Sequence, residues 1–266
     1  MPRLSEPDYL AIQYKTADNL DARRDLHARF STEQLSWLQW VFDQIEMPSD
    51  GSLLEAGCGT GALWSENGGR IPPGWQITLS DMSPGMLEKT SSDLAPISRS
   101  RDITYKTINI QDIPEPDESF DAAIANHMLY HVPDRQRAIS ELHRVLKPGG
   151  LLLAATNGAN HMIELAKLVQ QFDPSYMNVR GAESFGLENG AEQLSELFSE
   201  VECLPFDSSL LVTEVEPIVA YVLSSDLPLL KNNKREAFIT EVKRVIEVGP
   251  FHVTKNPGLF CARKST

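Results

Sequence analysis

Residues 53–64, LLEAGCGTGALW, constrain the fold more strongly than any other segment, because an apolar run there leads through three glycines into a helical pattern. The apolar run ends at Leu54, and Gly57, Gly59 and Gly61 follow at alternate positions. Glycines provide a tight turn, and they lack the Cβ atom that would keep a ligand away from the backbone. A strand, a glycine turn and a helix in this order are typical of α/β sheets that bind a cofactor at the turn.

The residues around these glycines favour a cofactor without phosphates. Glu55 stands two residues before the first glycine, where its carboxylate would repel the pyrophosphate of a dinucleotide and attract a cation. The spacing GxGxG also differs from the dinucleotide fingerprint GxGxxG, since position 62 is Ala62.

Together with four later segments, this loop resembles the motifs of class I S-adenosylmethionine-dependent methyltransferases. The resemblance covers about residues 50–158 and keeps the family's order and spacing. Its further segments are ITLSDMSPGML (77–87), NIQDIP (109–114), FDAAIANHMLYHV (120–132) and VLKPGGLLLAATNG (145–158).

The resemblance implies S-adenosylmethionine as the cofactor. It places Asp81, 24 residues after Gly57, on the ribose hydroxyls, and Asp112 on the adenine amine with Ile113 packed on the base. The predicted cofactor-binding residues are Glu55, Gly57, Cys58, Gly59, Gly61, Asp81, Met82, Asp112, Ile113 and Asn126.

Some of these residues also have structural interpretations. Asp81 is a possible helix cap, with Ser83 competing for that position before Pro84. Asp112 also suits a solvated turn, and Cys58 a small buried filler.

The alternation of strand and helix patterns predicts an α/β fold: a Rossmann-like, doubly wound sheet, parallel for the most part, with helices on both faces. The resemblance implies seven strands with one antiparallel. We expect strands near 52–57, 75–80, 103–108, 119–126, 150–156, 201–206 and 258–263. Residues 1–48 are predicted to form an N-terminal helical lid, and residues 49–266 the methyltransferase domain, with helical insertions around 159–199 and 214–248. Residues 173–189 read as an irregular loop.

Charge and cysteine content restrict the partners and the compartment. With 24 Lys and Arg against 37 Asp and Glu, the formal net charge is −13, which disfavours nucleic acids and anionic membranes. No apolar run approaches the ~20 residues of a membrane span, and residues 1–13 lack a signal-peptide core. Cys58, Cys203 and Cys261 have neither disulfide nor metal spacing, so we expect a cytoplasmic protein.

The loop after the fourth strand contains the predicted catalytic residues, His127 and His131, whose unperturbed pKa suits proton transfer near neutrality. Tyr14, Tyr130 and His161 are predicted to contact the methyl acceptor. The alternative is that the imidazoles only fill the wall of the site or bond to a backbone carbonyl. No metal is predicted, because no His, Cys, Asp and Glu cluster has ligand spacing.

Three functions remain open on the sequence. The first is in-line methyl transfer from S-adenosylmethionine to an O, N or C nucleophile of a small molecule. The second is a non-catalytic protein that binds S-adenosylmethionine or S-adenosylhomocysteine. The third, a nucleotide-cofactor oxidoreductase, is disfavoured by Glu55 and by the GxGxG spacing. The sequence leaves the oligomeric state open.

Overall fold

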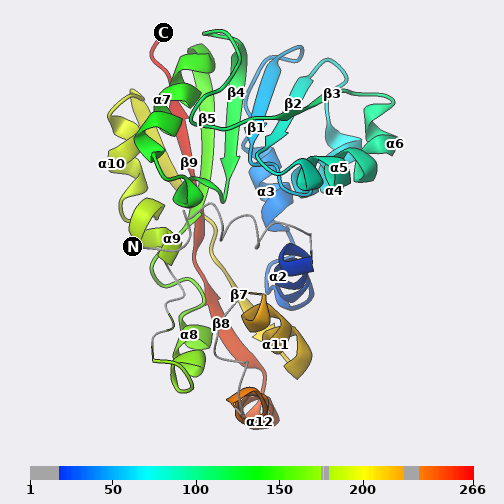
Figure 1. Cartoon of the computed structure of the whole chain (residues 1–266), viewed down its shortest axis with the longest axis vertical. Helices are drawn as coiled ribbons and strands as arrows, with labels where there is room; N and C mark the ends of the chain where they lie inside the picture. The colour runs from blue at the N-terminus through cyan, green and yellow to red at the C-terminus, as the bar shows by residue number, and fades with distance from the viewer. Residues whose placement is uncertain (1–17, 175, 177–179, 225–233) are drawn as a thin grey trace.

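The computed structural model describes residues 18–174, 176, 180–224 and 234–266. At its centre lies a seven-stranded sheet with the order β3-β2-β1-β4-β5-β9-β6 (Figure 1). Strand β9 runs antiparallel to β5 and β6, and the other neighbouring strands are parallel. The strands are β1 (Ser52–Ala56), β2 (Gln76–Asp81), β3 (Asp102–Thr107), β4 (Phe120–Asn126), β5 (Leu146–Asn157), β6 (Glu200–Pro205) and β9 (Pro257–Arg263). The predicted Rossmann-like fold with one antiparallel strand is confirmed.

Helices cover both faces of the sheet, so its central strands are apolar on both sides. Successive residues of β1 show this arrangement, since Leu53 packs into the core on one face and Leu54 into the core on the other. One face carries α3 (Trp37–Asp43), α4 (Ala62–Asn67), η2 (Gly68–Arg70), α5 (Pro84–Asp93) and α6 (Ala95–Ser98). The other carries η3 (Leu129–His131), α7 (Arg135–Val145), α9 (Arg180–Phe185) and α10 (Gly190–Ser195).

A second group of elements packs around its own core beyond the carboxyl end of β5 (Figure 1). Strand β8 leads directly into β9, whose first residue, Pro257, pairs with Asn157 at the end of β5. We call this group the cap unit. It consists of α2 (Asp18–Phe30), α8 (Ile163–Gln170), β7 (Ser208–Val212), α11 (Val215–Leu223), α12 (Lys234–Val248) and β8 (Phe251–Lys255).

Two local expectations were wrong. Residues 208–212 and 251–255 were not predicted as strands, but they pair antiparallel as β7 and β8. Each is only five residues long and finds its partner about forty residues away, which no local pattern reveals. The stretch 173–189 was predicted to be irregular throughout, whereas residues 180–185 form α9 against the β5 face of the sheet.

Candidate functional site

The glycine loop joins β1 to α4, and its three glycines differ in what surrounds them. A Cβ atom on Gly61 would lie 2.5 Å from Thr90 Cγ2, and one on Gly57 would lie 3.0 Å from Met128 Cγ. These two positions therefore need glycine for packing. A Cβ on Gly59 would meet only Leu20 Cδ1, at 3.9 Å, among the described residues. Gly59 is thus the position where a ligand can approach the backbone.

Asp81, at the end of β2, connects the glycine loop to the start of α5. Its Oδ2 accepts a hydrogen bond from Gly59 N at 3.0 Å, and its Oδ1 accepts one from Ser83 N at 2.8 Å. Burial raises the pKa of this carboxyl group, and the backbone donors act against that rise. Ser83 caps α5, since its Oγ accepts the Met86 amide at 3.3 Å. The alternative that Asp81 is the helix cap is therefore wrong.

Glu55 is buried beneath the glycine loop, with 2% of its surface exposed. Trp64 Nε1, in α4, donates a hydrogen bond to Glu55 Oε2 at 2.5 Å. Burial raises the pKa of Glu55 to about 7, against the effect of the Trp64 hydrogen bond. A positive charge near this loop would favour the ionised form, so the carboxyl group suits a cationic ligand.

Two of the predicted cofactor residues differ sharply in exposure. Cys58 is buried, and burial raises the pKa of its thiol, so it is an unreactive filler with a backbone amide bound to Ser80 O. Met82 is 65% exposed and available to a ligand beside Asp81.

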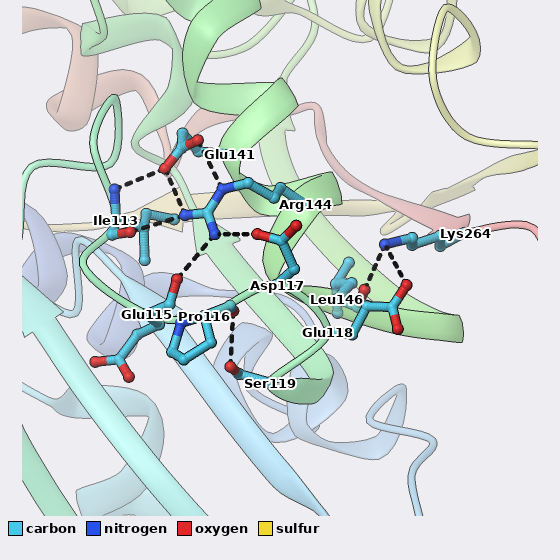
Figure 2. A network of polar contacts seen from close by, with 10 residues as sticks. All are labelled: Ile113, Glu115, Pro116, Asp117, Glu118, Ser119, Glu141, Arg144, Leu146 and Lys264. Carbon is cyan, nitrogen blue, oxygen red and sulfur yellow. Dashed lines mark hydrogen bonds and ion pairs between the residues drawn. The ribbon is translucent and has the colours of Figure 1, made fainter.

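The loop that carries Asp112 is held to α7 by two charged side chains (Figure 2). Glu141 Oε2 accepts the Ile113 amide at 2.9 Å, while Arg144 donates to Ile113 O and to Glu115 O, both at 2.8 Å. Arg144 also bonds to both oxygens of Glu141. This network leaves Asp112 exposed and buries Ile113 in the core.

The sequence analysis did not identify Glu141 or Arg144 as contributors to the site. The only signal in the sequence is their spacing of three residues near the end of a predicted helix.

Asn126 is the last residue of β4, His127 follows it, and both residues contact α3. Trp37 Nε1 donates to Asn126 Oδ1 at 3.4 Å, and the Trp37 ring lies 5.2 Å from the His127 ring. His127 has a φ of 56°, a conformation that is costly outside glycine and that occurs at functional sites. Its Nδ1 is buried without a hydrogen-bond partner in the described part of the chain. Burial lowers the pKa of His127 to about 4.

His131 and Tyr130 lie in η3, with ring centroids 4.5 Å apart. The His131 amide bonds to Met128 O at 2.9 Å, and α9 packs against this turn through Ser184, whose Oγ donates to Tyr130 O at 3.3 Å. The charge of His131 acts on His127, which places the two predicted catalytic imidazoles near each other.

His161 lies after β5, at the same sheet edge as His127. Its Nδ1 accepts a hydrogen bond from Asn256 N at 3.1 Å, and its ring stacks 6.1 Å from the His27 ring of α2. Burial holds the pKa of His161 well below its ordinary value. The sequence analysis missed His27, because α2 matches no motif. Tyr14 lies outside the described residues.

Helix α2 passes over the glycine loop. In addition to the Leu20 contact, Arg24 Nη1 reaches Thr60 Oγ1 at 3.5 Å, while Arg23 bonds to Ser224 at the end of α11. The cap unit thus contacts the loop directly.

The described residues contain neither a cluster of metal-ligand side chains nor a membrane-spanning helix. No three His, Cys, Asp or Glu side chains there come together as metal ligands. No described helix has the length and apolar character needed to cross a bilayer. That no metal takes part stays a prediction.

Comparisons with known proteins agree with this arrangement. Residues 54–154 match the family described as a methyltransferase domain. The chain is 33% identical over 126 residues to malonyl-[acyl-carrier protein] O-methyltransferase of Serratia marcescens, covering 46% of this chain and 44% of that one. It is 27% identical over 178 residues to the ubiquinone/menaquinone biosynthesis C-methyltransferase UbiE of Psychromonas ingrahamii, covering 61% and 70%. The chain spans about half the length of most of the curated relatives it matches.

Among solved structures, one similar fold is phosphoethanolamine N-methyltransferase 2 of Haemonchus contortus in complex with phosphomonomethylethanolamine and S-adenosylhomocysteine. The TM-score is 0.61 at 18% identity, over 97% of this chain and 60% of that one. The glycine loop, Asp81 and the strand order agree with these matches, which support the assignment of residues 54–154 to a class I S-adenosylmethionine-dependent methyltransferase domain.

Proposed function

We propose that the chain transfers a methyl group from S-adenosylmethionine to a small-molecule acceptor. The observation that carries this proposal is the meeting of two loops at one sheet edge: the glycine loop after β1, fixed by Asp81, and the His127 loop after β4. Met128, next to His127, packs on Gly57, so the two loops are in contact.

The residues around the glycine loop fit S-adenosylmethionine. The open position at Gly59 admits a ligand, Glu55 suits a cation, and Asp81 has carboxylate lone pairs beyond the two that Gly59 and Ser83 use. The exposed carboxylate of Asp112 can accept a hydrogen bond from the adenine amine. When bound, the sulfonium supplies an electrophilic methyl group, whose bond to sulfur breaks as the acceptor's electron pair forms the new bond.

The chain itself contributes position and a proton acceptor. Holding the two reactants in line is worth about 7 to 11 kcal/mol of the barrier. His127 remains neutral at ordinary pH because burial lowers its pKa to about 4, so its ring can accept a hydrogen bond or a proton from an acceptor hydroxyl or amine. His131, four residues further along the same loop, is the second candidate for this proton acceptor.

We further propose that the cap unit encloses the acceptor. The contacts of α2 with Gly59 and Thr60 support this role, as does the position of β8 beyond the end of β5. This proposal places the N-terminal lid within residues 1–48 and the insertions around 159–199 and 214–248.

The three cysteines are free thiols, which supports the cytoplasm as the compartment.

Calorimetry with S-adenosylmethionine, S-adenosylhomocysteine and NAD tests the cofactor. We expect the first two to bind and NAD not to bind; tighter binding of NAD would exclude the proposal. Incubation with metabolite extracts and methyl-labelled cofactor then tests transfer. Cofactor binding without any transferred label would favour the non-catalytic alternative.

A further inference from the structure

Four nitrogen bases from four separate segments lie within electrostatic reach of one another: His27 of α2, His127 after β4, His161 after β5 and Lys255 of β8. The rings of His27 and His161 stack at 6.1 Å, and Asn256, next to Lys255, donates its amide to His161 Nδ1. The charge of Lys255 acts on all three imidazoles. We call these four residues the basic cluster.

Lys255 is unusual for a lysine, because only 9% of its surface is exposed. Its Nζ lies 5.7 Å from the centroid of the Phe206 ring and makes no ion pair within the described part of the chain. Burial lowers the pKa of Lys255, and the more distant carboxylate of Glu33 opposes this only in part. A buried ammonium without a carboxylate partner is costly unless a ligand supplies the negative charge.

Buried polar atoms in the same place also lack partners. Nδ1 of His27, Nδ1 of His127 and Oδ1 of Asn157 have no hydrogen-bond partner among the described residues. Buried polar groups are nearly always satisfied in folded proteins, so these orphaned atoms, two of them on imidazoles of the basic cluster, indicate a site for a polar ligand.

Aromatic rings line the cluster on the α3 side. Trp37, Trp40 and Phe206 contact one another with centroids 5.1 to 5.5 Å apart, and Trp37 also contacts His127. Tyr221 of α11 meets the edge of His27 at 6.0 Å. These walls suit a flat, apolar body rather than a small hydrated ion.

We propose that the basic cluster binds the methyl acceptor through an anionic group, so that the acceptor is an organic acid with a flat apolar body. This inference rests on the proposed methyl transfer, because it assigns the cluster to the acceptor of that reaction. Arg24 and Leu20 touch the glycine loop, and His27 follows them by three and seven residues on α2, about 5 to 10 Å along the helix axis. The anionic group therefore lies close to the cofactor loop.

An anion bound at the basic cluster would supply the charge and the hydrogen-bond partners that the buried groups there lack. It would face Lys255 and the three histidines, with the Tyr221 ring at the edge of His27. A negative charge there raises the pKa of each imidazole, which in the free protein is lowered by burial and by the neighbouring bases. Binding an anion should therefore take up protons from solution at His27 or His161, whereas binding a neutral analogue should not.

The test uses three pairs of probes of nearly the same size and shape, each an anionic carboxylate with its neutral amide: benzoate and benzamide, phenylacetate and phenylacetamide, and indole-3-acetate and its amide. Calorimetry is carried out on the full chain with and without S-adenosylhomocysteine. At about pH 7 we expect at least one acid to bind about tenfold or more tighter than its amide. In buffers of different ionisation heat, the acid should show net proton uptake.

Lys255→Met and His27→Asn, made separately, should each reduce the preference for the acid to about threefold or less, while S-adenosylhomocysteine affinity stays unchanged. Lys243→Met is the matched control, because Lys243 is an exposed lysine of the same cap unit. It should retain the full preference and the proton uptake.

Several results would overturn the inference: equal or tighter binding of the amides, no acid bound by a protein that binds S-adenosylhomocysteine, or a preference that survives both substitutions. Failure of S-adenosylhomocysteine to bind would instead contradict the proposed function. The acid–amide comparison on the free protein would still decide the inference about the basic cluster.

Discussion

Asp81 Oδ2 accepts the amide of Gly59 at 3.0 Å, and this hydrogen bond ties the end of β2 to the one loop glycine that is open to a ligand. Because the other oxygen of Asp81 holds Ser83, a single carboxylate positions both the glycine loop and the start of α5. The residue predicted to bind the ribose thus also shapes the loop that is predicted to bind the rest of the cofactor.

Replacing Asp81 should therefore affect both binding and stability. Asp81→Ala removes charge-assisted hydrogen bonds to the ribose, and we expect S-adenosylhomocysteine to bind about 1.5 to 3 kcal/mol more weakly in calorimetry. Ser83→Ala serves as the control, since it removes the α5 cap at a cost of about 1 kcal/mol in unfolding free energy but spares the carboxylate. If Asp81→Ala binds the ligand as wild type does, Asp81 only supports the loop.

Glu55 makes stability depend on pH in a definite direction. Its folded pKa of about 7 lies above the ordinary value of 4.5, so the fold favours the neutral form. The stability it contributes is present below its ordinary pKa and is lost as pH rises through about 7, amounting to about 3 kcal/mol.

Glu55→Gln keeps an acceptor for Trp64 Nε1 and removes the titration. In urea unfolding at about pH 8, we expect this variant to be more stable than wild type by about 1 to 3 kcal/mol, whereas near pH 4 the difference should vanish. The same variant should bind S-adenosylmethionine more weakly, because the charge that faces the cation is gone. A variant that is less stable at pH 8 would contradict this account of Glu55.

Arg144 should act on the cofactor through the Asp112 loop. Arg144→Met removes the donors to Ile113 O and Glu115 O and leaves Glu141 without its cation (Figure 2). Since Glu141 is largely buried, we expect a loss of about 2 to 3 kcal/mol in unfolding free energy.

A measurement of adenosine affinity separates a local effect on the Asp112 loop from general loosening. We expect adenosine to bind more weakly to Arg144→Met, while Arg244→Met, at an exposed ion pair in α12, should leave both quantities unchanged. If Arg144→Met binds adenosine as tightly as wild type does, the Asp112 loop does not depend on Arg144 for its position.

The sequence was sufficient for features that depend on neighbouring residues. Gly57, Gly59 and Gly61 lie within five positions, and the buried strands β1, β4 and β5 are nearly continuous apolar runs, so the sheet and its glycine turn were predicted correctly. Ser83 was also predicted from the sequence as one of two possible caps of α5, but the choice between Ser83 and Asp81 required the hydrogen bonds.

Features that join distant segments were not predictable. His27 and His161 stand 134 positions apart, and Lys255 lies in a strand that exists only because β7 pairs with it. Likewise, Glu141 shows its function only when the loop at Ile113 folds onto α7. Tertiary packing, rather than local propensity, decides these positions.

Metal independence is a prediction about activity. Because no cluster of His, Cys, Asp and Glu in the sequence has ligand spacing, we expect methyl transfer to proceed unchanged after exhaustive treatment with a chelator. The readout is label transfer before and after chelation, with Mg²⁺ and Zn²⁺ added back separately. Activity that stops with the chelator and returns with either ion would contradict the prediction.

The role of the two catalytic candidates can be read from the pH dependence of turnover. His127→Ala removes a proton acceptor that burial keeps neutral, and general base catalysis contributes roughly 10²- to 10⁴-fold. We expect turnover to fall within that range while S-adenosylhomocysteine affinity stays intact. The lost activity should recover as pH rises, because an acceptor that ionises in solution needs no base.

His131→Ala tests the second imidazole in the same way, and exposed His252→Ala is the control. If both variants remain within a factor of about three of wild type, neither histidine removes a proton, and catalysis rests on the positioning of the two reactants.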